Sequence, residues 1–168
     1  KDGAMYMSSW SSVIKKSTQY IIKKHFNDSS NIQLVDIGSG KGKVLCVWEL
    51  MLKQFENVEI IGIEHSKELV DICYKNLEII KAKKTRIINK DILSVDLSKS
   101  KNALLIYMFN PFNEKVLSLF IKKLNKRPAI IIYNNPLYSN IMIKNNFKKI
   151  KEKSFWHESG YYAIFKNY

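Results

Sequence analysis

The sequence is poor in cysteine and histidine, and this shortage argues against a metalloprotein. It has two cysteines, Cys46 and Cys73, which are far apart and lack the spacing of metal ligands. The histidines, His25, His65 and His157, are equally scattered. We therefore expect no zinc or other metal site. Both cysteines fall on the apolar side of an expected helix, which is typical of reduced thiols in the core of a cytoplasmic protein.

Long hydrophobic runs are also missing. No apolar stretch approaches the roughly 20 residues that a membrane-spanning helix needs. The first ten residues, KDGAMYMSSW, have no apolar core of the kind found in signal peptides. We therefore expect a cytoplasmic protein without a membrane span. The length of 168 residues and a hydrophobic content of 46% are typical of one globular domain, which we place at 1–168.

Acidic residues are scarce beside basic ones, 15 against 28, and the formal net charge is +13. A basic surface attracts phosphate chains, so a nucleic acid, RNA in particular, is a candidate partner. Only two of the basic residues are arginine, however, and recognition of phosphates and bases favours the arginine fork. An AT-rich coding sequence would also produce many Lys, Asn and Ile codons. The sequence leaves both interpretations of the charge open.

Apolar periodicity predicts strands and helices in alternation. Helical spacing is found at 8–25 and between successive β-rich runs, and a short helix is expected over 137–144. The predicted strands are 32–37, 58–64, 85–91, 102–110 and 128–135, followed by a hairpin within 147–168. The pattern predicts an α/β fold: a doubly wound, mostly parallel seven-stranded sheet with a C-terminal antiparallel hairpin and helices on both faces.

The first strand runs into the sequence DIGSGKG, which contains Asp36, Gly38, Gly40 and Gly42. Glycines at the carboxyl end of a parallel strand allow a sharp turn and a close approach of a ligand to the backbone. The spacing fits neither a phosphate-binding P-loop nor the G-x-G-x-x-G dinucleotide fingerprint. A carboxylate at position 36 is unfavourable beside a pyrophosphate and favourable beside an amine. The motif therefore indicates a ligand with an ammonium group.

The pattern D-x-G-x-G-x-G after the first strand resembles motif I of the class I, Rossmann-like S-adenosylmethionine-dependent methyltransferases. The resemblance implies that the cofactor is S-adenosyl-L-methionine. It also implies that residues 29–168 form a Rossmann-like core behind an N-terminal helical lid segment, 1–28. Asp36, Gly38, Ser39, Gly40 and Gly42 would then hold the methionine part of the cofactor.

Acidic residues after the next two strands extend the resemblance. Glu64 ends the second strand, where the family places an acid that accepts both ribose hydroxyls. Asp91 and Ile92 follow the third strand, where the family surrounds adenine with a polar and an apolar residue. His65 would flank the adenine or begin the loop.

The end of the fourth strand should lie near the reacting methyl group, and there the sequence reads Asn110-Pro111-Phe112. This resembles the N-P-P-[YF] motif of methyltransferases that act on planar amines, but it lacks the second proline. It resembles equally the Asn-Phe sequence of the small non-SET lysine methyltransferases. The family would use these three residues in catalysis, and Asn110 also beside the cofactor. Alternatively, Asn110 caps the following helix and Pro111 begins it.

Two further segments are expected at the mouth of the site. Tyr133, Asn134 and Asn135 end the fifth strand and are weak candidates for contact with the substrate. The segment containing Tyr6 precedes the first strand and would fold over the cofactor. The methyl acceptor is not assigned by these motifs: RNA, protein and a small metabolite are all candidates. A catalytically silent binding module is the rival interpretation, and the spacing of Asp36 and Glu64 argues against it.

Overall fold

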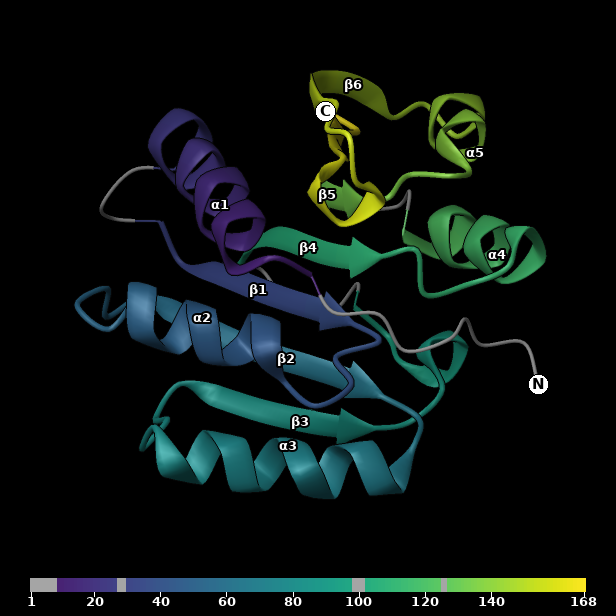
Figure 1. Ribbon diagram of the computed structural model, residues 1–168. Coiled ribbons are helices and arrows are strands. Elements are labelled where there is room, and N and C mark those ends of the chain that lie inside the picture. The colour runs from purple at the N-terminus through teal and green to yellow at the C-terminus, as the bar shows by residue number, and fades with distance from the viewer. Residues whose placement is uncertain (1–8, 27–29, 98–101, 125–126) are drawn as a thin grey trace.

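The computed structural model of the protein describes residues 9–26, 30–97, 102–124 and 127–168 (Figure 1). One seven-stranded sheet has the order β3-β2-β1-β4-β5-β7-β6. The strands are β1 (Ile32–Ile37), β2 (Val58–Glu64), β3 (Thr85–Asn89), β4 (Ala103–Phe109), β5 (Ala129–Asn134), β6 (Lys148–Lys153) and β7 (Tyr162–Lys166). The helices are α1 (Ser11–His25), α2 (Lys43–Met51), α3 (Lys67–Ile79), α4 (Glu114–Leu124) and α5 (Ser139–Lys144), with short 3₁₀ turns η1 (Ile92–Ser94) and η2 (Glu158–Gly160).

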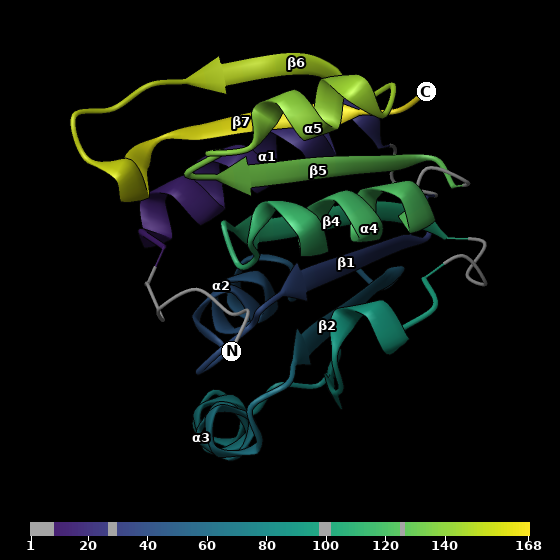
Figure 2. The ribbon, with the colours of Figure 1, turned by 90° about the vertical axis from the view of Figure 1, so that its right-hand side faces the viewer.

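The helices form a layer on each face of the sheet (Figures 1 and 2). Side chains alternate along a strand, so Leu34 packs with α1, α2 and α3, whereas Val35 packs with α4 and α5. Every residue of β1 and β5 is buried, as expected for strands covered on both sides. Trp48 is fully buried in α2, and its indole N–H donates to the Thr18 hydroxyl of α1 at 2.9 Å.

The chain order places a switch point at the carboxyl ends of β1 and β4. From β1 the chain builds outward through β2 and β3, and it then returns to β4 on the other side of β1. Ile37 at the end of β1 lies beside Ile63 and Met108. Ligands of open α/β sheets bind outside the carboxyl ends of the strands at such a point. The loops that follow β1, β2, β4 and β5 therefore surround one region.

The predicted fold class and the closing hairpin are confirmed. β7 pairs antiparallel with both β5 and β6, and the other neighbouring strands pair parallel. The third strand is shorter than its predicted range of 85–91, since it ends at Asn89 and Asp91 caps the turn η1 instead. In the part of the chain that the structure describes, no helix is both long and apolar enough to cross a bilayer.

Candidate functional site

The glycine motif forms a tight loop after β1, and the chain leaves it directly into α2. Gly38, Gly40 and Gly42 have φ of 72°, 52° and 82°, the left-handed region that side chains with a Cβ rarely adopt. The N–H groups of Gly38 and Ser39 donate to the Ile63 carbonyl at 2.9 and 3.1 Å. The loop is therefore tied to the end of β2, the strand that carries Glu64.

Two of these glycines make room for parts of the protein itself. A Cβ on Gly42 would collide with Sγ of Cys73, so α3 packs directly against the loop. A Cβ on Gly38 would lie 3.0 Å from Cβ of Pro111. The loop after β1 is thus in contact with the segment after β4, and the two regions predicted to bind cofactor and acceptor touch each other.

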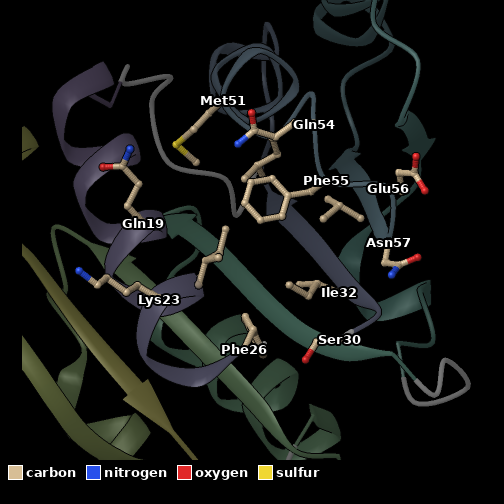
Figure 3. A pocket seen from close by; sticks show the side chains of 13 residues that line it. Gln19, Lys23, Phe26, Ser30, Ile32, Met51, Gln54, Phe55, Glu56 and Asn57 are labelled. Carbon is tan, nitrogen blue, oxygen red and sulfur yellow. The ribbon is translucent and has the colours of Figure 1, made fainter. Parts of the chain in front are cut away.

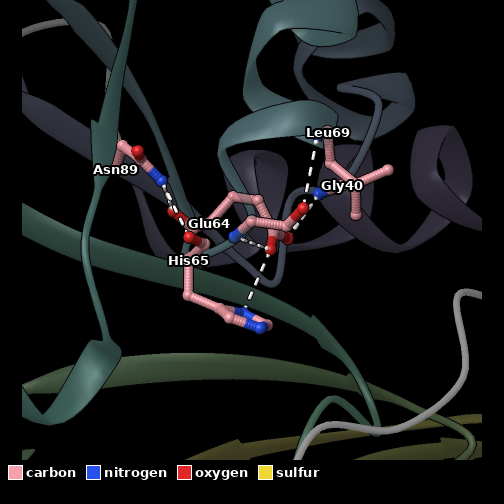
Figure 4. A network of polar contacts seen from close by, with 6 residues as sticks. Gly40, Glu64, His65, Leu69 and Asn89 are labelled. Carbon is pink, nitrogen blue, oxygen red and sulfur yellow. Dashed lines mark hydrogen bonds and ion pairs between the residues drawn. The ribbon is translucent and has the colours of Figure 1, made fainter.

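Glu64 is 5% exposed and its carboxylate organises the surrounding backbone (Figure 4). Oε2 accepts the N–H of Gly40 at 3.0 Å, and Oε1 accepts the N–H of Ser66 at 2.9 Å. Nδ1 of the exposed His65 lies 3.1 Å from Oε1. Asn89 at the end of β3 donates to the carbonyls of Glu64 and His65 at 2.8 and 3.0 Å, so β3 also fixes this turn.

Asp36 lies within the sheet, beside Gly62 of β2 and Tyr107 of β4. It is 4% exposed, and burial, followed by the nearby Glu64 carboxylate, raises the pKa of its carboxyl well above its usual value. Ser39 in the loop has a buried hydroxyl oxygen with no hydrogen-bond partner among the described residues. A buried acid and a buried hydroxyl of this kind are stabilised by a polar, positively charged ligand.

The two residues expected around adenine lie after β3. The Asp91 side chain is exposed, and its Oδ1 accepts the N–H of Leu93 at 2.7 Å, which caps η1. Ile92 is buried at 5% exposure and packs in the α4 side of the core. Their contact with adenine stays a prediction.

Side-chain contacts hold the segment after β4 in place. Asn110 has φ of 39°, and its side-chain carbonyl oxygen accepts the hydroxyl of Tyr133 at 2.9 Å. Asn110 is not the cap of α4, since that role belongs to Asn113, whose Oδ1 accepts the N–H of Val116 at 3.0 Å. Phe112 packs against Phe120 of α4, with ring centroids 6.2 Å apart. The alternative interpretation of Asn110 and Pro111 as a helix start is therefore wrong.

Behind Asn110 lies a second polar contact that the sequence did not indicate. The Tyr107 hydroxyl donates to Oδ1 of Asn134 at 3.0 Å and also meets the Ser9 side chain. The Asn134 amide donates to the carbonyls of Ser159 and Tyr161. Asn134 is fully buried, and its hydrogen bonds hold the β6–β7 connection against β5.

The other weak substrate candidates are placed less favourably for direct contact. Tyr133 and Asn135 are buried at 1% and 6% exposure, and the N–H of Asn135 donates to the Tyr161 carbonyl at 2.8 Å. Tyr6 lies outside the described residues. Substrate contact by any of these residues stays a prediction.

A cavity of about 1000 Å³ lies at the other end of the strands (Figure 3). Apolar Phe26, Met51 and Phe55 line it, with Gln19 and Lys23 of α1 beside them. It also includes Ile32 and Val58, the first residues of β1 and β2. Since β1 is roughly 20 Å long, this cavity is separate from the glycine loop.

The described residues fit S-adenosylmethionine, the cofactor that the motif implies. The raised pKa of Asp36 would fall beside an ammonium group, and the Ser39 hydroxyl would gain a polar partner. Glu64 uses its oxygens for backbone N–H groups, yet a carboxylate has about four acceptor positions. Room for ribose hydroxyls therefore remains, most simply where the exposed His65 now lies.

Comparison with known proteins gives one family match. The family model for protein-L-isoaspartate(D-aspartate) O-methyltransferases (PCMT) matches residues 4–95, more than half of the chain. No curated protein matches the sequence.

Solved structures with this fold are numerous. One is a SAM-dependent methyltransferase from Aquifex aeolicus, with 14% identity, coverage of 95% of this chain and 98% of that chain, and a TM-score of 0.63. A second is an RNA methyltransferase from Salinibacter ruber in complex with S-adenosyl-L-homocysteine (12% identity, 95% and 92% coverage, TM-score 0.64). A third is the magnesium protoporphyrin IX methyltransferase of Synechocystis PCC 6803 with bound SAM (12% identity, 93% and 77% coverage, TM-score 0.64). At these identities the likeness shows the shared fold.

Proposed function

Because this chain belongs to the protein-L-isoaspartate(D-aspartate) O-methyltransferase family and is an S-adenosylmethionine-dependent methyltransferase, we propose that its acceptor is a planar amino group bound at the carboxyl end of β4. One observation carries the proposal. The side-chain oxygen of Asn110 is fixed by the Tyr133 hydroxyl, in a segment whose next residue, Pro111, touches Gly38 of the glycine loop. A hydrogen-bond acceptor is thus fixed beside the loop proposed to hold the cofactor.

We infer that Asp36, Ser39 and the glycine loop hold the methionine end of the cofactor and that Glu64 accepts the ribose hydroxyls. We also infer, from the family resemblance, that Asp91 and Ile92 flank the adenine. S-adenosylmethionine supplies a methyl group that is already activated by the sulfonium centre. The protein's own part is therefore to align the nucleophile and to exclude water.

Asn110 is suited to orient an amine. Its side-chain oxygen accepts the Tyr133 hydroxyl at 2.9 Å and has a second lone pair that can accept an N–H of the acceptor. This hydrogen bond would direct the nitrogen of the acceptor and restrict its rotation. Phe112, which is partly exposed, follows two residues later and offers a ring to a planar group.

The two tyrosines that the structure describes beside this site are poor bases, which favours a planar amine over lysine. Burial raises the pKa of both Tyr107 and Tyr133, so neither hydroxyl accepts a proton near neutral pH. A lysine side chain is protonated at neutral pH and would first need a base. The exocyclic amine of a nucleobase or a side-chain amide is uncharged, and its proton is lost to water after methylation.

A carboxylate acceptor is the second candidate, and the name of the matching family favours it. An ionised carboxylate also needs no base. The family match ends at residue 95, however, whereas β4 begins at Ala103, so the acceptor side lies outside the match. The carbonyl oxygen of Asn110 would repel a carboxylate, and the Tyr133 hydroxyl is already donated to Asn110.

The test is label transfer from methyl-labelled cofactor to a cell extract, followed by nuclease, protease and mild alkali. A methyl ester releases methanol in alkali, whereas an N-methyl group is stable. We expect label that survives alkali, that depends on Asn110, and that is lost with Asn110→Gly, which keeps the positive φ. Asn31→Ala, at an exposed position at the other end of the sheet, serves as the matched control. Alkali-labile label would favour the carboxylate instead.

A further inference from the structure

Four aromatic rings gather where the start of α1 meets the β6–β7 connection, and we call Trp10, Phe155, Trp156 and His157 the aromatic cluster. Trp10 stacks on His157 with centroids 5.2 Å apart, and it lies 5.8 Å from Phe155 and 6.1 Å from Trp156. Trp156 is 84% exposed, although tryptophan has the largest of all side chains. Since a tryptophan buried on folding contributes substantially to stability, so exposed a ring indicates a use at the surface.

The aromatic cluster lies at the end of the sheet where the parallel strands have their carboxyl ends. The carbonyls of Ser159 and Tyr161, just after His157, accept the side-chain amide of Asn134 at the end of β5. In Figure 2 the arrowheads of β1 and β5 point to the left, the side where α1 begins and where the chain connects β6 to β7. Since Asn134 pairs with Phe109 of β4, the aromatic cluster lies at the same end of the sheet as the segment that carries Asn110.

Lysines continue from this cluster along α1, β6 and β7, and we call this the basic surface. Its members, which lie on the face of the sheet that α1 covers, are Lys16, Lys24, Lys151, Lys153 and Lys166. Lys16 and Lys24 are spaced four residues on either side of Tyr20, so the three share one side of α1. Nζ of Lys151 lies 3.6 Å from the centroid of the Tyr20 ring, which brings α1 and β6 together.

Among the side chains that the structure describes, few acids lie on the basic surface. The sequence of α1 contains no Asp or Glu, and Glu152 of β6 is paired with Lys149 and the Tyr161 hydroxyl. Partial burial lowers the pKa of the His25 imidazole, and the nearby charges of Lys166 and Lys24 lower it further. Like charges gathered in this way repel one another, and a polyanion would relieve the repulsion.

Resting on the proposed function, we propose that the aromatic cluster and the basic surface bind single-stranded nucleic acid and present one of its bases to Asn110. Lysines neutralise the phosphate backbone while exposed rings stack on bases, and this combination is how single strands are bound without sequence readout. Lys153 Nζ lies 6.0 Å from the ring centroid of Phe155, so a phosphate contact and a stacking contact occur side by side.

An acidic polypeptide is the competing occupant, and the aromatic cluster argues against it. Acidic side chains would pair with the lysines alone. They would not stack on the Trp156 ring, which is 84% exposed. A duplex is also less suitable, because its bases are already stacked and are not available to a ring. The exocyclic amine of a nucleobase can reach an active site only when the base is unpaired.

The test is the fluorescence anisotropy of a labelled 12-nucleotide RNA strand, with a DNA strand of the same sequence, an RNA duplex and polyglutamate as competitors. We expect both single strands to bind and the duplex and polyglutamate to compete poorly. Trp156→Ala should weaken binding about tenfold or more, through the loss of stacking. Equal competition by polyglutamate would overturn the proposal, as would unchanged affinity of Trp156→Ala.

Salt dependence tests the basic surface separately. The triple variant Lys16→Gln, Lys151→Gln, Lys153→Gln should bind more weakly and should reduce the slope of log K against log salt by roughly 2. The control, Lys53→Gln, Lys75→Gln, Lys122→Gln, removes the same charge from exposed positions beyond this surface and should retain the slope. Equal losses in the two triple variants would overturn the proposal, because net charge alone would then explain binding.

Binding of the strand is measured without turnover, so it does not depend on the acceptor. Tight, salt-dependent binding together with label transfer only to protein would support the binding surface and contradict the nucleobase as acceptor. Label transfer to RNA together with full affinity of Trp156→Ala would support the nucleobase as acceptor and contradict the binding surface. The melting temperatures of Trp156→Ala and of the control triple variant should match the wild type, since their altered side chains are exposed. The triple variant with Lys151→Gln also loses the contact with Tyr20, so its binding is measured well below its own melting temperature.

Discussion

Gly42 and Cys73 are in direct contact, with the thiol of α3 occupying the space where residue 42 would carry a Cβ. The missing Cβ of the third glycine therefore lets α3 pack against the loop, in addition to any room that it makes for a ligand. Cys73 itself is fully buried and its pKa is raised to about 12, mainly by burial, so it is a packing thiol and not a nucleophile.

Gly42→Ala should destabilise the protein by about 2–4 kcal/mol, because it combines overpacking with a φ of 82°. Chemical denaturation measures the loss. Cys73→Ala in the same chain removes the clashing sulfur, so the double variant should be more stable than the sum of the single changes predicts. Strict additivity would show that the contact is unimportant and that only the backbone conformation restricts residue 42.

Glu64→Ala should abolish most of the rise in melting temperature that S-adenosyl-L-homocysteine causes in the wild type. The variant loses the proposed acceptor for ribose and also the carboxylate that accepts the Gly40 and Ser66 N–H groups. Thermal shift at high ligand excess measures this, since a ligand stabilises the state that it binds. Glu59→Ala, whose partly exposed carboxylate pairs with Arg86 of β3, is the control and should keep the full shift. An unchanged affinity of Glu64→Ala would contradict the ribose assignment.

Asp36→Asn should stabilise the ligand-free protein while it weakens cofactor binding. Burial and Glu64 raise the pKa of Asp36 in the folded state, so the folded protein holds this proton more tightly than the unfolded chain. Stability is therefore lost as pH rises from the unfolded pKa towards the raised folded pKa, and this loss persists at neutral pH.

The asparagine variant avoids this cost and should gain on the order of 1 kcal/mol at pH 7, with the gain vanishing near pH 4. Urea denaturation across this pH range is the measurement. Calorimetry with the cofactor should show the opposite effect, a lower affinity at pH 7, because the ammonium group loses its ionised partner. A variant that is less stable than the wild type at every pH would contradict the raised pKa of the buried Asp36 carboxyl.

Much of this fold could be predicted because its signals are local. The strand at 32–37 and the strand at 58–64 were located to the residue by their apolar runs, and motif I lies between a strand and a helix as expected. The predicted strand at 85–91 was too long because apolar spacing does not reveal the cap that Asp91 forms on η1. Boundaries set by a single side-chain hydrogen bond are not visible in periodicity.

The contacts around the proposed acceptor site could not be predicted from the sequence, because they join distant parts of the chain. Tyr133 and Asn110 are 23 residues apart, and nothing in either segment indicates that one hydroxyl fixes the other's amide. The same is true of Trp10 and His157, whose stacking joins the start of α1 to the β6–β7 connection. The sheet order brings them together, so these pairs follow from the fold and not from a motif.

Tyr133→Phe tests whether the fixed orientation of Asn110 matters for the chemistry. The change removes only the hydroxyl that donates to the Asn110 oxygen at 2.9 Å, and the ring stays in the core. A freely turning amide would present its NH₂ to the acceptor part of the time, so single-turnover methyl transfer should slow about tenfold or more while cofactor affinity is unchanged. Loss of a buried hydrogen bond should cost about 1 kcal/mol of stability as well. Tyr161→Phe removes a hydroxyl that bonds Glu152 at the surface, and it should leave the rate as it is. Equal rates for the wild type and both variants would mean that Asn110 does not orient the acceptor.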